Sequence, residues 1–177
     1  MKKISLLLIF AFLMMGLHAQ SINSEKSVVN FEISALSITT VDGTMKGMQG
    51  EVVFDENDLS TSKFDVSIDV KTIDTGIKKR DEHLRTADFF EVETYPTIRF
   101  TSNNISKTSN GYLAKGTLAM KNVSKNIELP FTVIKNSDGA LLTGNLVLQR
   151  KAYKVGESTS NFTVGNKVKV EILCYLN

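Results

Sequence analysis

The chain has 177 residues, of which 42% are hydrophobic, 8% aromatic and 23% charged, with one cysteine and two prolines. These values are close to the averages of globular domains, and they exclude collagen-like, low-complexity and intrinsically disordered chains. The length is typical of a single domain. Because one cysteine cannot form an intramolecular disulfide, the stability must come from a hydrophobic core.

The first 19 residues have the pattern of a secretory signal peptide. Lys2 and Lys3 precede an apolar run over residues 4–17, and Ala19 supplies the small residue that cleavage requires. The run is shorter than the ~20 residues of a membrane-spanning helix, and no cysteine stands at the cleavage junction to carry a lipid anchor. We therefore expect a signal peptide over 1–19, a mature domain over 20–177 and a periplasmic or secreted location. An uncleaved anchor over 4–17 is the alternative.

The charge of the mature chain argues against polyanionic partners. The whole sequence has 21 Lys and Arg against 19 Asp and Glu, and loss of Lys2 and Lys3 leaves 19 of each sign. Without a basic stripe, nucleic acid is not an expected partner, because its binding depends on neutralising phosphates. No apolar run of membrane-spanning length follows residue 19, so we expect no stable membrane insertion. Monomer and homodimer both stay open.

Alternation of apolar and polar residues recurs along the mature chain and predicts half-buried β-strands. The clearest case is 63–71, where Phe64, Val66, Ile68 and Val70 alternate with polar residues. Together with this segment, the pattern predicts eight strands, at 29–35, 48–54, 63–71, 98–100, 112–120, 127–133, 142–148 and 168–176. The fold class is therefore all-β, and the strands could close as a barrel or stack as a sandwich.

The segment 76–96 breaks the alternation and is rich in charge. The spacing of Leu84 and Ala87 with either Asp88 or Phe90 fits a short helix, which Pro96 would end because it restricts the preceding residue to extended conformations. We predict a short helical insertion between the third and fourth strands.

Three glycines fall on the predicted apolar faces, where a packed core would normally place bulk. They are Gly50, Gly116 and Gly144. One interpretation is that they leave space for a ligand, and the other is that they mark bulges or bends needed for closure.

Catalytic and metal motifs are weak. His83 is the only histidine after residue 19, too few nitrogen and sulfur ligands for a zinc site, and no Gly-x-Ser-x-Gly elbow is present. Asp74-Thr75-Gly76 matches the tripeptide of aspartic proteases but occurs once, whereas such sites need two carboxylates. We expect neither a metal nor a cofactor. An enzyme acting on a small substrate near His83 is retained as an alternative.

An ordered series of motifs closely resembles the YceI-like family. The central motifs are IDTG at 73–76, RDEHLR at 80–85, DFF at 88–90 and YPTIRF at 95–100, and further matches lie at 27–31, 54–55, 116–118, 129–130 and Arg150. The resemblance implies an eight-stranded antiparallel, lipocalin-like barrel whose hydrophobic pore holds a polyisoprenoid or another long-chain lipid, such as a quinone. The implied function is non-catalytic binding for transport, storage or stress protection. A filled barrel that acts through protein contacts is a further alternative.

On this resemblance, inward-facing apolar residues would line the pore, and three polar residues near its mouth would meet a headgroup. The apolar candidates are Phe31, Ile33, Met48, Phe54, Ile68, Phe100, Leu118, Met120, Leu129 and Leu146, and the polar candidates are Arg80, His83 and Arg85. The competing interpretations are core packing for the first set and ion pairs with Asp81, Glu82 and Asp88 for the second. Tyr153 carries a hydroxyl where the family usually has phenylalanine.

Overall fold

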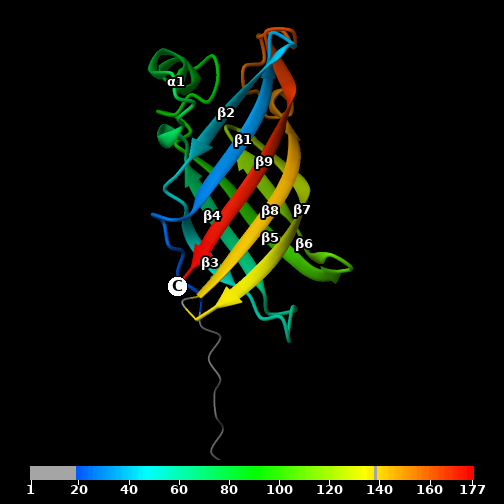
Figure 1. The fold of residues 1–177 in the computed structure, drawn as a ribbon. Coiled ribbons are helices and arrows are strands. Elements are labelled where there is room, and N and C mark those ends of the chain that lie inside the picture. Colours follow the sequence, from blue (N-terminus) through cyan, green and yellow to red (C-terminus); the bar gives the residue numbers. More distant parts are fainter. Residues whose placement is uncertain (1–18, 138) are drawn as a thin grey trace, which may run out of the picture.

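A single curled antiparallel sheet dominates the computed structural model, which describes residues 19–137 and 139–177 (Figure 1). Its nine strands, in chain order, are β1 (Val28–Ala35), β2 (Thr39–Met45), β3 (Gln49–Val53), β4 (Lys63–Asp69), β5 (Thr97–Thr108), β6 (Gly111–Met120), β7 (Val123–Asn136), β8 (Gly139–Gln149) and β9 (Val164–Leu176). The hydrogen-bonded order is β2-β1-β9-β8-β7-β6-β5-β4-β3. The all-β prediction is thus confirmed. The predicted signal peptide lies outside the described residues except for Ala19.

The strand count is one higher than predicted, because β2 escaped the sequence pattern. Only Val41, Gly43 and Met45 of this strand face inward, and glycine carries no side chain to mark the alternation. Gly43 is required by its neighbour on β1, since a Cβ atom there would lie 2.2 Å from Phe31 Cζ. The missing side chain therefore makes room for an aromatic ring.

The two edge strands, β2 and β3, follow each other in the chain but do not pair with each other. Other segments cover their free edges. Thr44 on β2 exchanges backbone hydrogen bonds of 2.8 and 3.0 Å with Asp74, and the Gln20 N–H donates to the Val52 carbonyl on β3 at 2.8 Å. These contacts protect edges that would otherwise be open to pairing with another chain, and the sheet curls into a barrel (Figure 1).

The helical insertion lies where it was predicted, between β4 and β5. It contains the helix α1 (Lys78–Arg85), and two short 3₁₀ helices occur elsewhere, η1 (Val70–Thr72) and η2 (Arg150–Tyr153). The helix ends well before Pro96, because Thr86 leaves the helical conformation and its N–H and hydroxyl both donate to the His83 carbonyl. Among the described residues, no helix is both long and apolar enough to cross a membrane.

The three glycines on apolar faces have different roles. A Cβ on Gly116 would lie 2.3 Å from the Thr101 carbonyl oxygen, and a Cβ on Gly50, whose φ is +129°, would lie 2.1 Å from the Asp65 carbonyl oxygen. These two glycines allow close backbone approach, and Gly116 pairs beside an irregularity in β5. At Gly144 the nearest atom is a side-chain methyl, Leu129 Cδ1 at 3.1 Å. Only the space at Gly144 faces the barrel interior.

Candidate functional site

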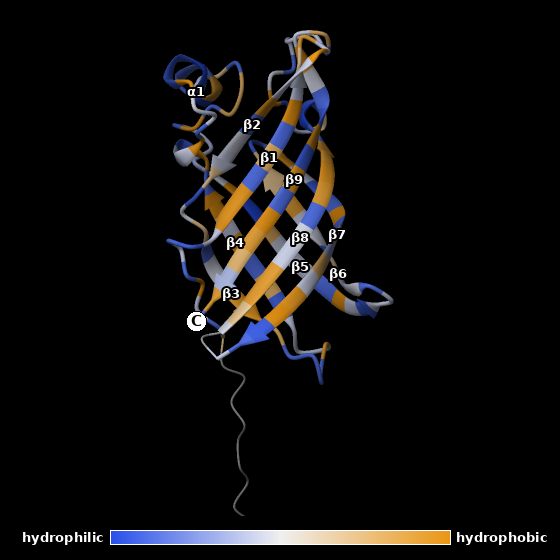
Figure 2. Ribbon diagram, in the orientation of Figure 1, coloured by the Kyte–Doolittle hydropathy of each residue, from blue (hydrophilic) through white to orange (hydrophobic). Residues whose placement is uncertain are grey.

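The barrel encloses an apolar cavity of about 550 Å³. Most of its wall consists of aliphatic and aromatic side chains from the sheet. Hydrophobic and hydrophilic residues alternate along the strands (Figure 2), and successive side chains of a strand point to opposite faces. The cavity volume falls within the range of roughly 300–1,000 Å³ typical of small-molecule sites. The interior is therefore hollow rather than filled by side chains.

Aromatic rings block one end of the cavity. Phe64 and Phe131 belong to its lining and meet edge to face, with ring centroids 5.2 Å apart. Behind them, Phe54 packs edge-on against Phe131 at 5.8 Å, and Tyr112 stacks on the same ring at 5.4 Å. We call these four residues the closed end.

The opposite end of the cavity reaches the surface, and we call it the mouth. Its lining there includes residues that are exposed, among them Leu36 in the β1–β2 turn and His83 on α1. Three segments surround this end: the β1–β2 turn, the insertion that carries α1, and the loop from η2 to β9 (Figure 1). A ligand can thus enter from this side only through irregular segments, not through the sheet.

Arg150 holds the loop between η2 and β9 in place. Its side chain is 5% exposed, and all five of its N–H donors bond to backbone carbonyls: Nε to Gly165, Nη1 to Val155 and Gly156, and Nη2 to Thr159 and Val164. Burial lowers the pKa of the guanidinium. With every donor engaged, Arg150 is a structural element of the mouth and has no donor left for a ligand.

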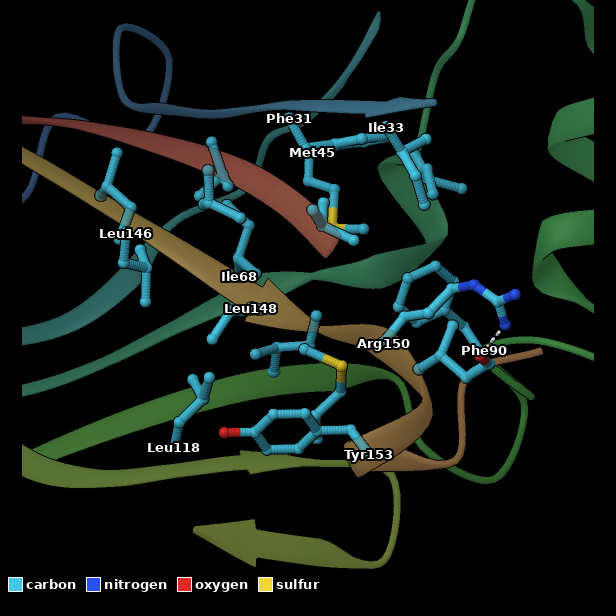
Figure 3. Close-up of a pocket in the computed structure, with 18 of the residues that line it drawn as sticks. Phe31, Ile33, Met45, Ile68, Phe90, Leu118, Leu146, Leu148, Arg150 and Tyr153 are labelled. Carbon is cyan, nitrogen blue, oxygen red and sulfur yellow. Dashed lines mark hydrogen bonds between the residues drawn. The ribbon is translucent and has the colours of Figure 1, made fainter. Parts of the chain in front are cut away.

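Tyr153 lies one helical turn further on, at the end of η2, and its side chain is part of the cavity wall. It is 2% exposed, and burial raises the pKa of its phenol. Figure 3 shows its ring among the lining side chains, with the hydroxyl directed towards Leu118 and away from the Arg150 guanidinium.

Nine of the ten apolar residues predicted for the pore lie in the cavity lining: Phe31, Ile33, Met48, Ile68, Phe100, Leu118, Met120, Leu129 and Leu146. Several of them are seen in Figure 3. Phe54 is the exception and does not line the cavity. Its ring lies 4.9 Å from that of Tyr112, in the closed end. Alternation reports which face of a strand a residue occupies but not its depth along the barrel, so the sequence could not separate Phe54 from the rest. Contact of the nine with a ligand stays a prediction.

The three polar candidates are not equivalent. Arg80 and His83 line the cavity, whereas Arg85 does not. The Arg85 guanidinium donates to the carbonyls of Lys71 at 2.9 Å and Ile73 at 2.6 Å, and so ties α1 to the segment after β4. Arg85 thus has a structural role in holding α1, and the structure places it outside the cavity lining.

Arg80 and His83 are also engaged within the protein. Arg80 Nε and Nη2 donate to the hydroxyl and the carbonyl of Thr75, each at 2.7 Å. His83 Nε2 lies 3.1 Å from a carboxylate oxygen of Asp88, and its ring meets Phe89 edge to face at 5.1 Å. The expected contact with Asp88 is therefore present for His83, whereas the partner of Arg80 is a threonine.

The Asp-Thr-Gly tripeptide has a structural explanation. The carboxylate of Asp74 accepts the Gly76 N–H at 2.8 Å, and Gly76 has a φ of +78°. Thr75 donates through its N–H and its hydroxyl to Asp81, which is 6% exposed. The tripeptide forms a turn that anchors the start of α1.

Sequence reasoning missed the cavity residues of the mouth loop, including Tyr153, Val155 and Thr159. This loop has no periodic pattern, and its approach to the cavity depends on the tertiary bonds of Arg150. Two features of the sequence could have pointed to this loop: Arg150, which belongs to the family motifs, and Tyr153, which carries a hydroxyl where the family usually has phenylalanine.

Comparison with known proteins agrees with this architecture. The model of the YceI-like domain matches residues 21–175. The chain belongs to the YceI-like domain family. A UPF0312 protein of Photorhabdus laumondii is 33% identical over 108 residues, which cover 61% of this chain and 56% of that protein. The chain thus spans a little over half the length of this curated YceI-like relative.

Solved structures share the fold over nearly their whole length. BcnA of Burkholderia cenocepacia matches with a TM-score of 0.81 and 25% identity, covering 88% of this chain and 99% of that chain. A polyisoprenoid-binding domain from Saccharophagus degradans matches with a TM-score of 0.72 and 17% identity, covering 90% and 98%. The second likeness concerns the YceI-like fold alone.

Proposed function

We propose that this YceI-like chain is a non-catalytic binding protein that holds a polyisoprenoid or another long-chain lipid, including an isoprenoid quinone, inside its barrel. The observation that carries the proposal is the apolar cavity of about 550 Å³, blocked by aromatic rings at one end and reaching the surface at the other. The polyisoprenoid-binding domain of Saccharophagus degradans, which has the same fold, supports the ligand class.

The physical driving force is burial of the hydrocarbon chain. Each methylene-sized group moved from water into such a cavity contributes about 0.8 kcal/mol. A chain of several isoprene units can therefore be retained without strong polar contacts. A hollow of this size also favours a ligand-holding protein over a filled barrel that acts through protein contacts.

The geometry offers less support for an enzyme. His83 is exposed at the rim of the mouth, and its Nε2 atom pairs with Asp88 rather than with a serine or a cysteine. The proposal also includes export, with action as a carrier, a store or a protective binder outside the cytoplasm. Its basis is the predicted signal peptide, and N-terminal sequencing of the protein from the periplasmic fraction tests it.

The first experiment is native mass spectrometry of the mature chain, purified from its own exported fraction, with organic extraction of bound species. We expect a stoichiometric apolar adduct of long-chain mass. Gly144→Leu should abolish or strongly reduce this adduct, because its side chain would extend from β8 into the cavity past Leu129.

Asn145→Leu is the matched control, since the neighbouring position on β8 is exposed on the outside of the barrel. It adds the same hydrophobic bulk and should leave the adduct intact. Equal occupancy in Gly144→Leu and Asn145→Leu, with both variants folded by circular dichroism, would count against the cavity as the lipid site.

A further inference from the structure

The hydroxyl of Tyr153 faces the cavity without a protein partner. The ring packs among Phe89, Leu118, Met120 and Val155, and the residue is 2% exposed. Figure 3 shows the oxygen directed into the hollow. Within residues 19–137 and 139–177, no group donates a hydrogen bond to this oxygen or accepts one from it.

The hydroxyl oxygen is accessible from the cavity and is not sealed within the core, since Gln20 Oε1 is the one fully buried side-chain oxygen or nitrogen without a partner in residues 19–137 and 139–177. A phenylalanine would fill the same space in the wall without offering a polar group. The two arginines that line the cavity differ from Tyr153 in having partners within the protein. All the Arg150 donors bond to carbonyls, and Arg80 is bonded to Thr75. Tyr153 is thus a buried polar group of the cavity wall that remains available to a ligand.

The chemistry of the group defines what it can bind. Burial raises the pKa of Tyr153, so the phenol is neutral and protonated at physiological pH. Its free O–H is a hydrogen-bond donor that needs an acceptor. The surrounding side chains are apolar, and the hydroxyl points away from the Arg150 guanidinium (Figure 3). An uncharged acceptor fits this environment, whereas an anion would be desolvated there without a free cationic donor.

We propose that the cavity selects long-chain lipids that carry an uncharged carbonyl oxygen, and that the Tyr153 hydroxyl donates a hydrogen bond to that oxygen below the mouth. This inference rests on the proposed lipid-binding function and specifies its ligand class. The hydrocarbon tail then extends towards the closed end, and the hydrogen bond to the carbonyl fixes the depth of the ligand in the barrel.

The test compares two probes that differ in one group: farnesylacetone, an isoprenoid ketone, and the same chain with a methylene in place of the carbonyl. Each probe displaces the uncharged fluorophore N-phenyl-1-naphthylamine from the delipidated mature protein. The proteins are wild type, Tyr153→Phe and the control Tyr112→Phe, which removes a tyrosine hydroxyl from the closed end, outside the cavity lining. Thermal unfolding verifies that all three are folded.

We expect the wild type and Tyr112→Phe to bind the ketone about three- to tenfold more tightly than the hydrocarbon, the range of one net hydrogen bond. Tyr153→Phe should lose this preference and retain its affinity for the hydrocarbon. Equal affinity of the wild type for both probes, or a preference that survives in Tyr153→Phe, would overturn the inference but leave lipid binding intact. Failure of the wild type to bind either probe would instead refute the proposed function together with the inference.

Discussion

The two ends of the cavity are built by different physical means. At the closed end, rings from β4, β6, β7 and the residue after β3 pack against one another, with Phe131 in contact with Phe54, Phe64 and Tyr112. At the mouth, the irregular segments are held by arginine side chains that donate to backbone carbonyls. Burial of large rings stabilises the whole sheet, whereas the hydrogen bonds of a loop can open locally. The difference suits a binding protein whose barrel must stay folded while a ligand enters or leaves through the mouth.

The largest expected effect concerns the closed end. Phe131→Ala should lower the free energy of unfolding by about 4 kcal/mol, because it removes the ring on which the other three aromatic residues converge and leaves a void. Chemical denaturation measures this value. Phe162→Ala is the control, since Phe162 is 65% exposed and should change stability by less than about 0.5 kcal/mol. A similar small loss for Phe131→Ala would show that the closed end does not carry the stability of the barrel.

The second effect concerns the mouth. Arg150→Met should destabilise the protein by about 3 kcal/mol, since five carbonyls lose a charged donor. We expect the loss to be local. Hydrogen exchange should rise in residues 151–165 while β4–β7 keep their protection.

Arg150→Lys is the matched variant, because it keeps the positive charge but cannot reproduce the planar set of five donors. It should behave like Arg150→Met. Full protection of the loop in Arg150→Lys would mean that charge, and not the geometry of the guanidinium, holds the mouth.

The same contrast explains what the sequence could predict. Strands such as β4 were predicted because bulky residues mark each inward position, and nearly all the expected lining residues follow from that alternation. β2 was missed because its inward position 43 is a glycine fitted against Phe31. The depth of Phe54, the bonds of Arg85 to carbonyls after β4 and the donors of Arg150 all depend on contacts between distant segments. No local periodicity reports such contacts, which is why the mouth was the least predictable part.

The smallest expected effect is a dependence on pH that arises within the sheet. Burial raises the pKa of Cys174 from 9.0 to about 11, and a hydrogen bond with Ser27 opposes this only in part. The folded state therefore holds the thiol proton more tightly than the unfolded state. Its contribution of about 2.7 kcal/mol is present below pH 9 and is lost as the pH rises towards 11. Cys174→Ala should show a flatter decline in stability between these values when both proteins are unfolded in urea, since lysine and tyrosine titrations are common to both. Identical slopes would show that the thiol is solvated as in the unfolded chain, and the cavity wall at Cys174 would then be wet rather than apolar.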